Sequence, residues 1–228
     1  MKNHTRNILL AVSVTCIMLL MAASASAFDG QRKGFILGFG LGPGVDMHKQ
    51  NASVSIMGIS LLDQDFVDES KFAFMTDFKL GYAPSNQLII YYDNKVSWFK
   101  ADWGEDMQID IVSGGVNVLG YSDVMILSGL TGFGASYFLA PQAPSPFFTG
   151  GVGLASSMAF ESGASARIGF GFFVGGGYEF SPHWSVEGDI CYGSAGKSES
   201  PSEYAGLVDY DITSTDFAFK VSINVMAY

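Results

Sequence analysis

From Phe28 onward the chain alternates between apolar residues and small or polar ones. The clearest stretch is 166–180, ARIGFGFFVGGGYEF, in which Ile168, Phe170 and Phe172 share one phase and Arg167 and Gly171 share the other. Successive side chains of a β-strand point to opposite faces, so a repeat of two residues predicts strands and not helices. We therefore expect an all-β protein whose strands have one apolar face and one face rich in glycine.

The same alternation recurs along the chain and predicts eight strands. Their approximate ranges are 35–42, 72–82, 88–98, 123–139, 146–158, 166–180, 184–192 and 215–228. Segment 105–121, EDMQIDIVSGGVNVLGY, alternates only weakly. It could form a hairpin in a loop or two further strands, so ten strands remain an alternative.

The expected connections alternate between short and long. Short turns fall at 83–86, 140–145 and 181–183, whereas long loops fall at 46–70, 99–121 and 195–213. In an up-and-down barrel with both termini on one side, every short turn lies on that side and every long loop on the other. This asymmetry is typical of barrels in the bacterial outer membrane, with periplasmic turns and extracellular loops.

The apolar phase must face outward. An eight-stranded barrel has an interior only wide enough for side chains or one small ligand, and the apolar phase carries too many large side chains to fit there. A soluble barrel with an apolar interior is the alternative, but glycine on the opposite phase suits a cramped inner wall. Aromatic residues expected to form a girdle near the short turns, at the periplasmic interface, are Tyr82, Tyr137, Tyr178, Phe180, Trp184 and Tyr228.

The N-terminus predicts a secretory signal peptide over 1–27, which leaves a barrel domain over 28–228. Lys2 and Arg6 precede an apolar run, and Ala25-Ser26-Ala27 supplies a small-x-small cleavage site. The exported domain keeps a single cysteine, Cys191, so it can form no internal disulfide.

Charge excludes one class of partner and predicts the lining of the barrel. The chain has 22 acidic and 12 basic residues, a balance that would repel nucleic acid. The inward phase carries charges near mid-barrel, and buried charges must be paired or hydrated. We expect a structural ion-pair network there, and the alternative is the selectivity lining of a narrow pore. Its residues are Asp77, Lys79, Asp93, Lys95, Glu187, Asp189 and Lys220.

Little in the sequence points to catalysis. His48 lies at the start of the first expected loop, with Ser53 and Ser55 nearby, and His183 lies in a short turn. No motif surrounds either histidine, so we expect no catalytic residue, no cofactor and no metal site. The expected loops are acidic, which predicts a solvated anionic surface, and their acids are Asp46, Asp63, Asp65, Asp68, Glu69, Asp102, Glu105, Asp106 and Asp110.

Three stretches carry a family resemblance. The run GGYEFSPHWSVEGDICYG at 176–193, the opening GFILGFGLGPGV and the closing FKVSINVMAY resemble the small outer-membrane barrels related to OmpA and OmpX. The resemblance implies insertion by the BAM assembly machinery and contact with outer-membrane lipids and lipopolysaccharide. In that family the final aromatic faces lipid, whereas Tyr228 lies on the opposite phase of its strand, so a bulge near Met226-Ala227 is expected to restore the phase.

Together these features predict an eight-stranded antiparallel up-and-down transmembrane β-barrel in the bacterial outer membrane. We expect a non-enzymatic protein with a structural or surface-interaction role, carried by its extracellular loops. The alternatives are a narrow pore for small solutes, as in OmpW-like barrels, and a lipid A-modifying enzyme that would use His48. The sequence does not specify an oligomeric state.

Overall fold

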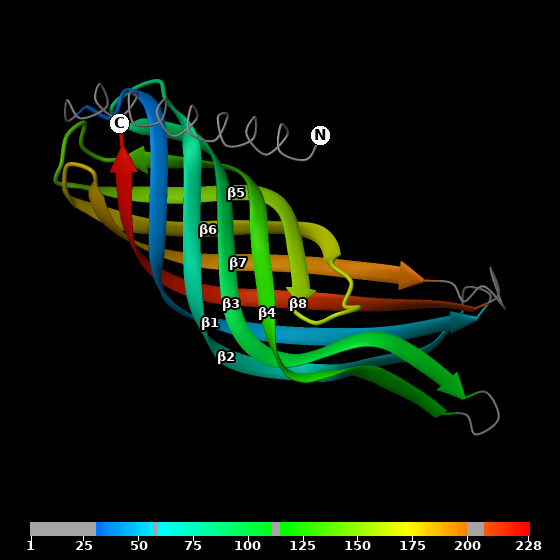
Figure 1. The fold of residues 1–228 in the computed structure, drawn as a ribbon. Coiled ribbons are helices and arrows are strands. Elements are labelled where there is room, and N and C mark those ends of the chain that lie inside the picture. Colours follow the sequence, from blue (N-terminus) through cyan, green and yellow to red (C-terminus); the bar gives the residue numbers. More distant parts are fainter. Residues whose placement is uncertain (1–30, 57–58, 111–114, 200–207) are drawn as a thin grey trace, which may run out of the picture.

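The computed structural model describes residues 31–56, 59–110, 115–199 and 208–228, so the predicted signal peptide lies outside the described residues. The described chain contains eight strands: β1 (Gly34–Ile56), β2 (Ile59–Ala83), β3 (Leu88–Asp110), β4 (Gly115–Phe138), β5 (Ser145–Ala159), β6 (Arg167–Ser181), β7 (Trp184–Glu199) and β8 (Val208–Ala227). Each strand pairs antiparallel with its neighbour in sequence, and β8 pairs with β1 to close the barrel. Figure 1 shows this ring, with the C-terminus at the end where the short turns lie. No helix in these ranges is long and apolar enough to cross a membrane.

The predicted fold is confirmed, and the ambiguous segment is resolved in favour of eight strands. Most of segment 105–121 continues β3 and β4, which pair as far as Asp110 and Gly115. These residues lengthen an existing hairpin and add no strand to the ring. The two strands shift register between Ala101 and Trp103 and again between Gly104 and Asp106. Such irregularities blur an alternation read from sequence alone.

The expectation of three long loops is wrong, because most of those residues belong to strands. The pairing of β1 with β2 runs to Ile56 and Ile59, and β7 still pairs with β8 at Glu199 and Tyr210. Beyond the membrane the outer face of a strand meets water, so it no longer needs apolar side chains. The backbone ladder continues there although the apolar phase that marks a strand in the sequence has ended.

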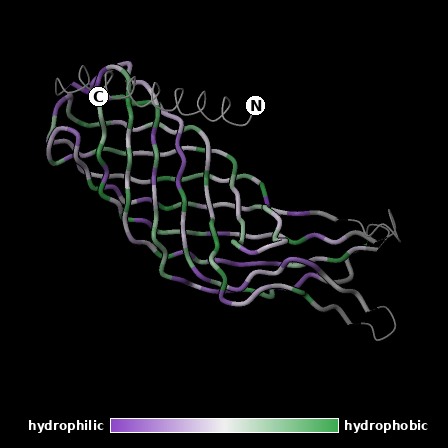
Figure 2. Tube along the Cα trace, in the orientation of Figure 1, coloured by the Kyte–Doolittle hydropathy of each residue, from purple (hydrophilic) through white to green (hydrophobic). Residues whose placement is uncertain are grey.

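The prediction that the apolar phase faces outward is confirmed. Phe72 on β2 is 74% exposed and Phe133 on β4 is 71% exposed, whereas Ile36 on the opposite phase is fully buried. The hydropathy of successive residues alternates along the strands in Figure 2. Glycine is needed where neighbouring strands approach closely: a Cβ on Gly42 would lie 1.9 Å from the backbone oxygen of Val221. The outward residues form a belt that suits acyl chains.

The wall changes beyond the apolar belt. The ladder between β2 and β3 ends at the pair Phe74 and Trp98, although both strands continue. Strands β5 and β6 end earlier than their neighbours (Figure 1). The extended parts therefore form a sheet of β7, β8, β1 and β2 and a separate pair of β3 and β4. The outer ends of β3 and β4 lie apart from those of β1 and β7 in Figure 1.

Candidate functional site

The middle of the lumen is filled by a network of ion pairs centred on Lys95. Its Nζ lies 2.9 Å from Oδ2 of Asp77, 2.8 Å from Oδ2 of Asp189 and 3.2 Å from Oε1 of Glu187. The same ammonium lies 4.4 Å from the centre of the Phe173 ring. These partners come from three strands, β2, β6 and β7, so one lysine on β3 links opposite walls of the barrel.

Two further lysines complete this lumen network. Lys79 Nζ lies 2.8 and 2.6 Å from the two carboxylate oxygens of Glu187, and Lys220 Nζ lies 2.8 Å from Oδ2 of Asp77. Asp93 lies at the edge of the network, 3.5 Å from Lys95. The structure thus brings together all seven charged residues that the sequence assigned to the mid-barrel network, and all seven are buried.

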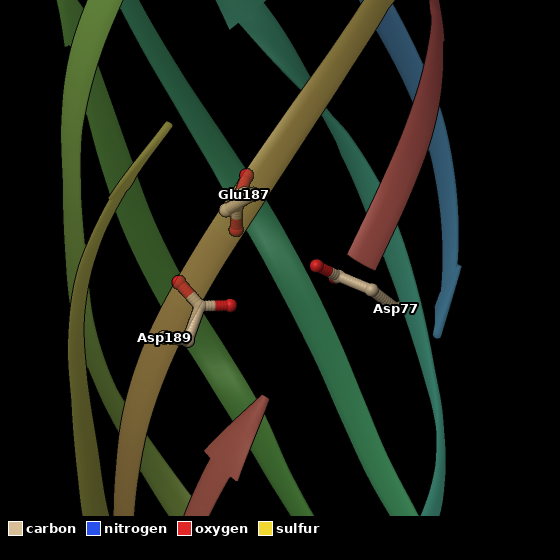
Figure 3. A group of neighbouring side chains, drawn as sticks. All are labelled: Asp77, Glu187 and Asp189. Atoms are coloured by element: carbon tan, nitrogen blue, oxygen red, sulfur yellow. The ribbon is translucent and has the colours of Figure 1, made fainter. Parts of the chain in front are cut away.

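Three of the carboxylates lie close enough to suggest a metal site. Asp77 on β2 and Glu187 and Asp189 on β7 each offer an oxygen within 4.8 Å of the others, and Figure 3 shows the three side chains converging. The ammonium groups described above already contact all three carboxylates. Positive charge is therefore supplied by lysine, and the donor set does not suit a divalent cation, which lysine would repel.

The periplasmic end is closed by a second group of polar contacts. Arg32 donates to Glu179 and stacks its guanidinium 4.0 Å from the centre of the Phe138 ring. The hydroxyl of Tyr228 donates to Glu179 at 2.5 Å and accepts from the backbone N–H of His183 at 2.9 Å. These contacts seal the barrel at the level of the short turns.

The prediction that Tyr228 belongs to the aromatic girdle is therefore wrong. Its side chain is buried in the lumen, and it shares the inward phase with Met226, so no bulge turns it toward lipid. Burial and the hydrogen bond to Glu179 raise the pKa of the Tyr228 hydroxyl above its ordinary value. The other aromatic residues proposed for the girdle have outward-facing, exposed side chains: Tyr82, Tyr137, Tyr178, Phe180 and Trp184.

His48 is a second correction, because it lies on β1 inside the barrel and not in a loop. Its Nδ1 lies 2.6 Å from Oδ1 of Asp216, and its Nε2 lies 2.7 Å from Nε2 of Gln50. The ring is fully buried. Ser53 and Ser55 occupy the opposite phase of β1, so the strand does not bring them to His48.

Trp103, from the β3–β4 hairpin, covers the outer mouth of the lumen. Its ring lies parallel to the His48 ring, with 6.3 Å between centres, and the Arg167 guanidinium lies 4.0 Å from its centre. The neighbouring peptide is held by side chains: Gly104 N–H donates to Gln50 Oε1 at 2.9 Å, and Arg167 donates to the Gly104 carbonyl. We call the β3 segment of Trp103 and Gly104 the outer cap.

Glu105 fixes the outer cap to the opposite wall. It accepts hydrogen bonds from Trp103 Nε1 at 2.9 Å and from the Ser165 N–H at 3.0 Å, and Lys197 lies 3.3 Å away. Burial by itself would raise the pKa of Glu105, but these bonds outweigh it and lower the pKa below its ordinary value. Glu105, together with Asp46, was expected on a solvated surface, and the structure buries both.

The sequence analysis did not identify most of the residues that form or hold the outer cap. Gln50, Trp103 and Asp216 fall in segments that the sequence assigned to loops or strand ends, although Arg167 was placed on the inward phase. The signal that could have found them is continued alternation: His48 and Gln50 keep the inward phase of β1 beyond the apolar belt. A cavity of about 40 Å³ lies between the outer cap and the lumen network, and Asp46, Cys191 and Asp216 form part of its lining.

Comparisons with known proteins found similar folds among solved structures. No family model matches the chain, and no curated protein matches its sequence. Among solved structures, the outer membrane protein OprG of Pseudomonas aeruginosa matches with a TM-score of 0.54 at 12% identity, covering 87% of this chain and 98% of OprG. Two further structures resemble it less closely. Ail of Yersinia pestis has a TM-score of 0.37 at 9% identity, covering 84% of this chain and 99% of Ail. The outer membrane protease OmpT of Escherichia coli has a TM-score of 0.41 at 10% identity, covering 84% of this chain and 98% of OmpT.

The closed ring, the outward apolar belt and the likeness to OprG define the class of protein. The chain is an integral β-barrel protein of the bacterial outer membrane. A likeness at 12% identity is one of fold, and a fold does not assign an activity.

Proposed function

We propose that this protein is a non-conducting, non-enzymatic outer-membrane barrel that acts through its extracellular strand extensions. The observation that carries the proposal is the filling of the lumen at three levels. Arg32, Glu179 and Tyr228 lie at the periplasmic end, the lumen network lies at mid-barrel, and the outer cap lies above.

Opening a path through these levels would be costly. An ion or solute that crosses the middle must separate Lys95 from carboxylates 2.8 and 2.9 Å away. Removing one partner of a buried ion pair costs about 3–5 kcal/mol, because it leaves an uncompensated charge in a low-dielectric site. Several such contacts would have to open together, which argues against steady conduction.

The extensions offer a rigid surface outside the membrane. Lys49 lies 2.6 Å from Asp65, and Asn51 donates to Asp63 at 2.6 Å, so these polar side chains of β1 and β2 are paired across the two strands. The hydrogen bond and charge of Asp65 raise the pKa of Lys49, and the bonds from Lys49 and Asn51 lower the pKa of Asp65. A strand-built acidic surface of this kind suits contact with components outside the cell.

Planar-bilayer recording tests the closed lumen. The purified barrel should give no steady channel current at neutral pH, although heat-modifiable gel migration shows that it is folded. A matched variant, Lys33→Gln, should behave identically because Lys33 lies outside the lumen and is exposed. A steady conductance from the wild-type barrel that falls when Lys95 or Lys220 is neutralised would refute the proposal.

Trimming the extensions tests the surface role. A variant in which β3 and β4 are joined by a tight turn just above Lys100 and Met125 should keep the barrel folded, because the ladder below remains intact. It should fail to restore envelope integrity, measured as detergent sensitivity, in cells that lack the native protein. Full restoration by the trimmed barrel would assign the role to the membrane-embedded part.

A narrow pore for small solutes is the second candidate, and the cavity of about 40 Å³ beside Lys95 and Lys220 is the observation that favours it. The cavity is large enough for about one or two waters. A lipid A-modifying enzyme has less support, since His48 is fully buried and both of its ring nitrogens have partners. Unchanged lipid A in cells that carry His48→Gln would close that case.

A further inference from the structure

The outer cap has a strand partner on one side only. Trp103 and Gly104 pair with β4, whereas the ladder between β3 and β2 has already ended at Trp98. The register of β3 with β4 also shifts on both sides of the cap. On its other edge the cap bonds to side chains, because the Gly104 N–H donates to Gln50 Oε1 at 2.9 Å and the Gly104 carbonyl accepts from Arg167. The position of the outer cap therefore depends on individual side-chain hydrogen bonds.

The bond from Gly104 is the first of three in a chain that ends at Asp216. Gln50 Nε2 lies 2.7 Å from His48 Nε2, and His48 Nδ1 lies 2.6 Å from Asp216 Oδ1. A backbone N–H can only donate, so the amide oxygen of Gln50 must face Gly104 and its NH2 group must face His48. That NH2 group donates to His48 Nε2, and His48 Nδ1–H donates to the Asp216 carboxylate. The chain of bonds therefore requires a neutral His48 with its proton on Nδ1.

A second proton on His48 is incompatible with this chain. The new Nε2–H would face the NH2 group of Gln50, and two donors cannot form a hydrogen bond. If the Gln50 amide turned around, its oxygen would accept from His48, but its NH2 group would then face the Gly104 N–H. A hydrogen bond from a charged donor is stronger than one between neutral groups, so the bond to His48 is the one that forms. Gly104 then loses its acceptor.

The charged groups near His48 permit this second proton. They come from β1, β3, β6, β7 and β8 and are Asp46, Glu105, Arg167, Lys197 and Asp216. Asp46 lies close enough to interact with both His48 and Asp216, and these two carboxylates stabilise positive charge on the ring. Arg167 opposes it, but Arg167 also interacts with Asp216 and Glu105. Lys197 is paired with Glu105 at 3.3 Å.

We propose that His48 is a proton-sensitive switch for the outer cap. Neutral His48 accepts from Gln50 and leaves the Gln50 oxygen to hold Gly104. Protonated His48 turns the Gln50 amide around and releases Trp103 from the outer mouth of the lumen. The switch goes beyond the closed lumen proposed above, because the lumen network contributes no residue to this chain of bonds and stays in place when the cap moves.

Quenching of Trp103 fluorescence by acrylamide tests the switch in the folded mature barrel. The chain has three tryptophans, so the variant Trp98→Phe/Trp184→Phe leaves Trp103 as the single reporter. The Stern–Volmer constant should rise about twofold or more as the pH is lowered from about 8 to about 5, the range in which imidazole changes charge. Heat-modifiable migration at both ends of this range shows that the barrel remains folded.

Two variants in the reporter background separate the switch from a structural role. His48→Gln can donate to Asp216 and accept from Gln50 but cannot take up a second proton, so quenching should stay low throughout the pH range. In Gln50→Glu the carboxylate can accept from protonated His48 and from the Gly104 N–H together. Quenching should therefore stay low at the acidic end although His48 is still present. If either variant does not fold, the other decides the question.

Three control variants should keep the acid response. His183→Gln removes the histidine at the periplasmic end, and Asp46→Asn removes a neighbouring group that could take up the proton instead. Glu105→Gln removes a carboxyl whose pKa is held below its ordinary value of 4.5 and which therefore stays charged in this range. An unchanged Stern–Volmer constant in the reporter barrel, a response that survives His48→Gln, a response lost in Asp46→Asn, or acid release in Gln50→Glu would each overturn the proposal. A channel current at neutral pH would refute the closed lumen and leave the switch standing.

Discussion

Replacing Lys95 by methionine should strongly destabilise the folded barrel. The substitution keeps much of the side-chain volume but removes the ammonium that lies 2.8 Å from Asp189, 2.9 Å from Asp77 and 3.2 Å from Glu187. Four carboxylates of the lumen network would then share two lysines. Breaking a buried ion pair costs about 3–5 kcal/mol, so we expect the free energy of unfolding to fall by about that amount.

Urea unfolding in detergent micelles, followed by heat-modifiable migration on cold gels, measures this loss. Lys33→Met is the matched control, because the same charge is removed from an exposed position and the expected change is within about 0.5 kcal/mol. The double variant Lys95→Met/Asp189→Asn should be less destabilised than the sum of its single variants, since it removes both members of the 2.8 Å pair.

Two results would refute this reasoning. A loss of less than about 1 kcal/mol for Lys95→Met would mean that the carboxylates are solvated or protonated and do not depend on the lysine. Strict additivity in the double-variant comparison would mean that Lys95 and Asp189 do not interact in the folded state. Either result would also weaken the argument for a closed lumen.

Three further predictions concern other levels of the barrel. The pKa of Glu105 is lowered in the folded protein, so its contribution to stability is present above the unfolded value of 4.5 and is lost as pH falls through the lower folded value. Proteolysis of the outer cap should therefore accelerate in that acidic range. The variant Glu105→Gln should show a weaker dependence of proteolysis on pH. Tyr228→Phe should lower the free energy of unfolding by about 1–3 kcal/mol, measured in urea, because the hydrogen bond to buried Glu179 is lost; an unchanged midpoint would contradict the inward placement. Gly42→Ala should yield no heat-modifiable barrel, because its Cβ would lie 1.9 Å from a backbone oxygen, whereas Gly188→Ala, with its nearest atom at 3.8 Å, should assemble normally.

The sequence alone predicted the architecture and the orientation of the wall. Alternation has a period of two only in strands, and it assigned residues such as Phe72 and Asp77 to opposite faces without any tertiary information. The limited interior of an eight-stranded barrel then decided which face meets lipid. It also placed the seven charges of the lumen network on the inward phase near mid-barrel, because alternation gives the face of each residue and its distance from a short turn gives its level.

The tertiary structure decided what lies beyond the belt and which residues meet inside. Where the outer face of a strand meets water, the apolar phase ends. His48 and Glu105 therefore resembled loop residues, although both lie on strands and their side chains are buried inside the barrel. Tyr228 was assigned to the girdle by its position at the chain end, whereas its phase and its bond to Glu179 turn it into the lumen. Pairings such as Trp103 with Arg167, and the early end of the ladder between β2 and β3, depend on the curvature and closure of the whole ring. Alternation records only the face on which a side chain lies, and contacts across a barrel require the positions of all the strands.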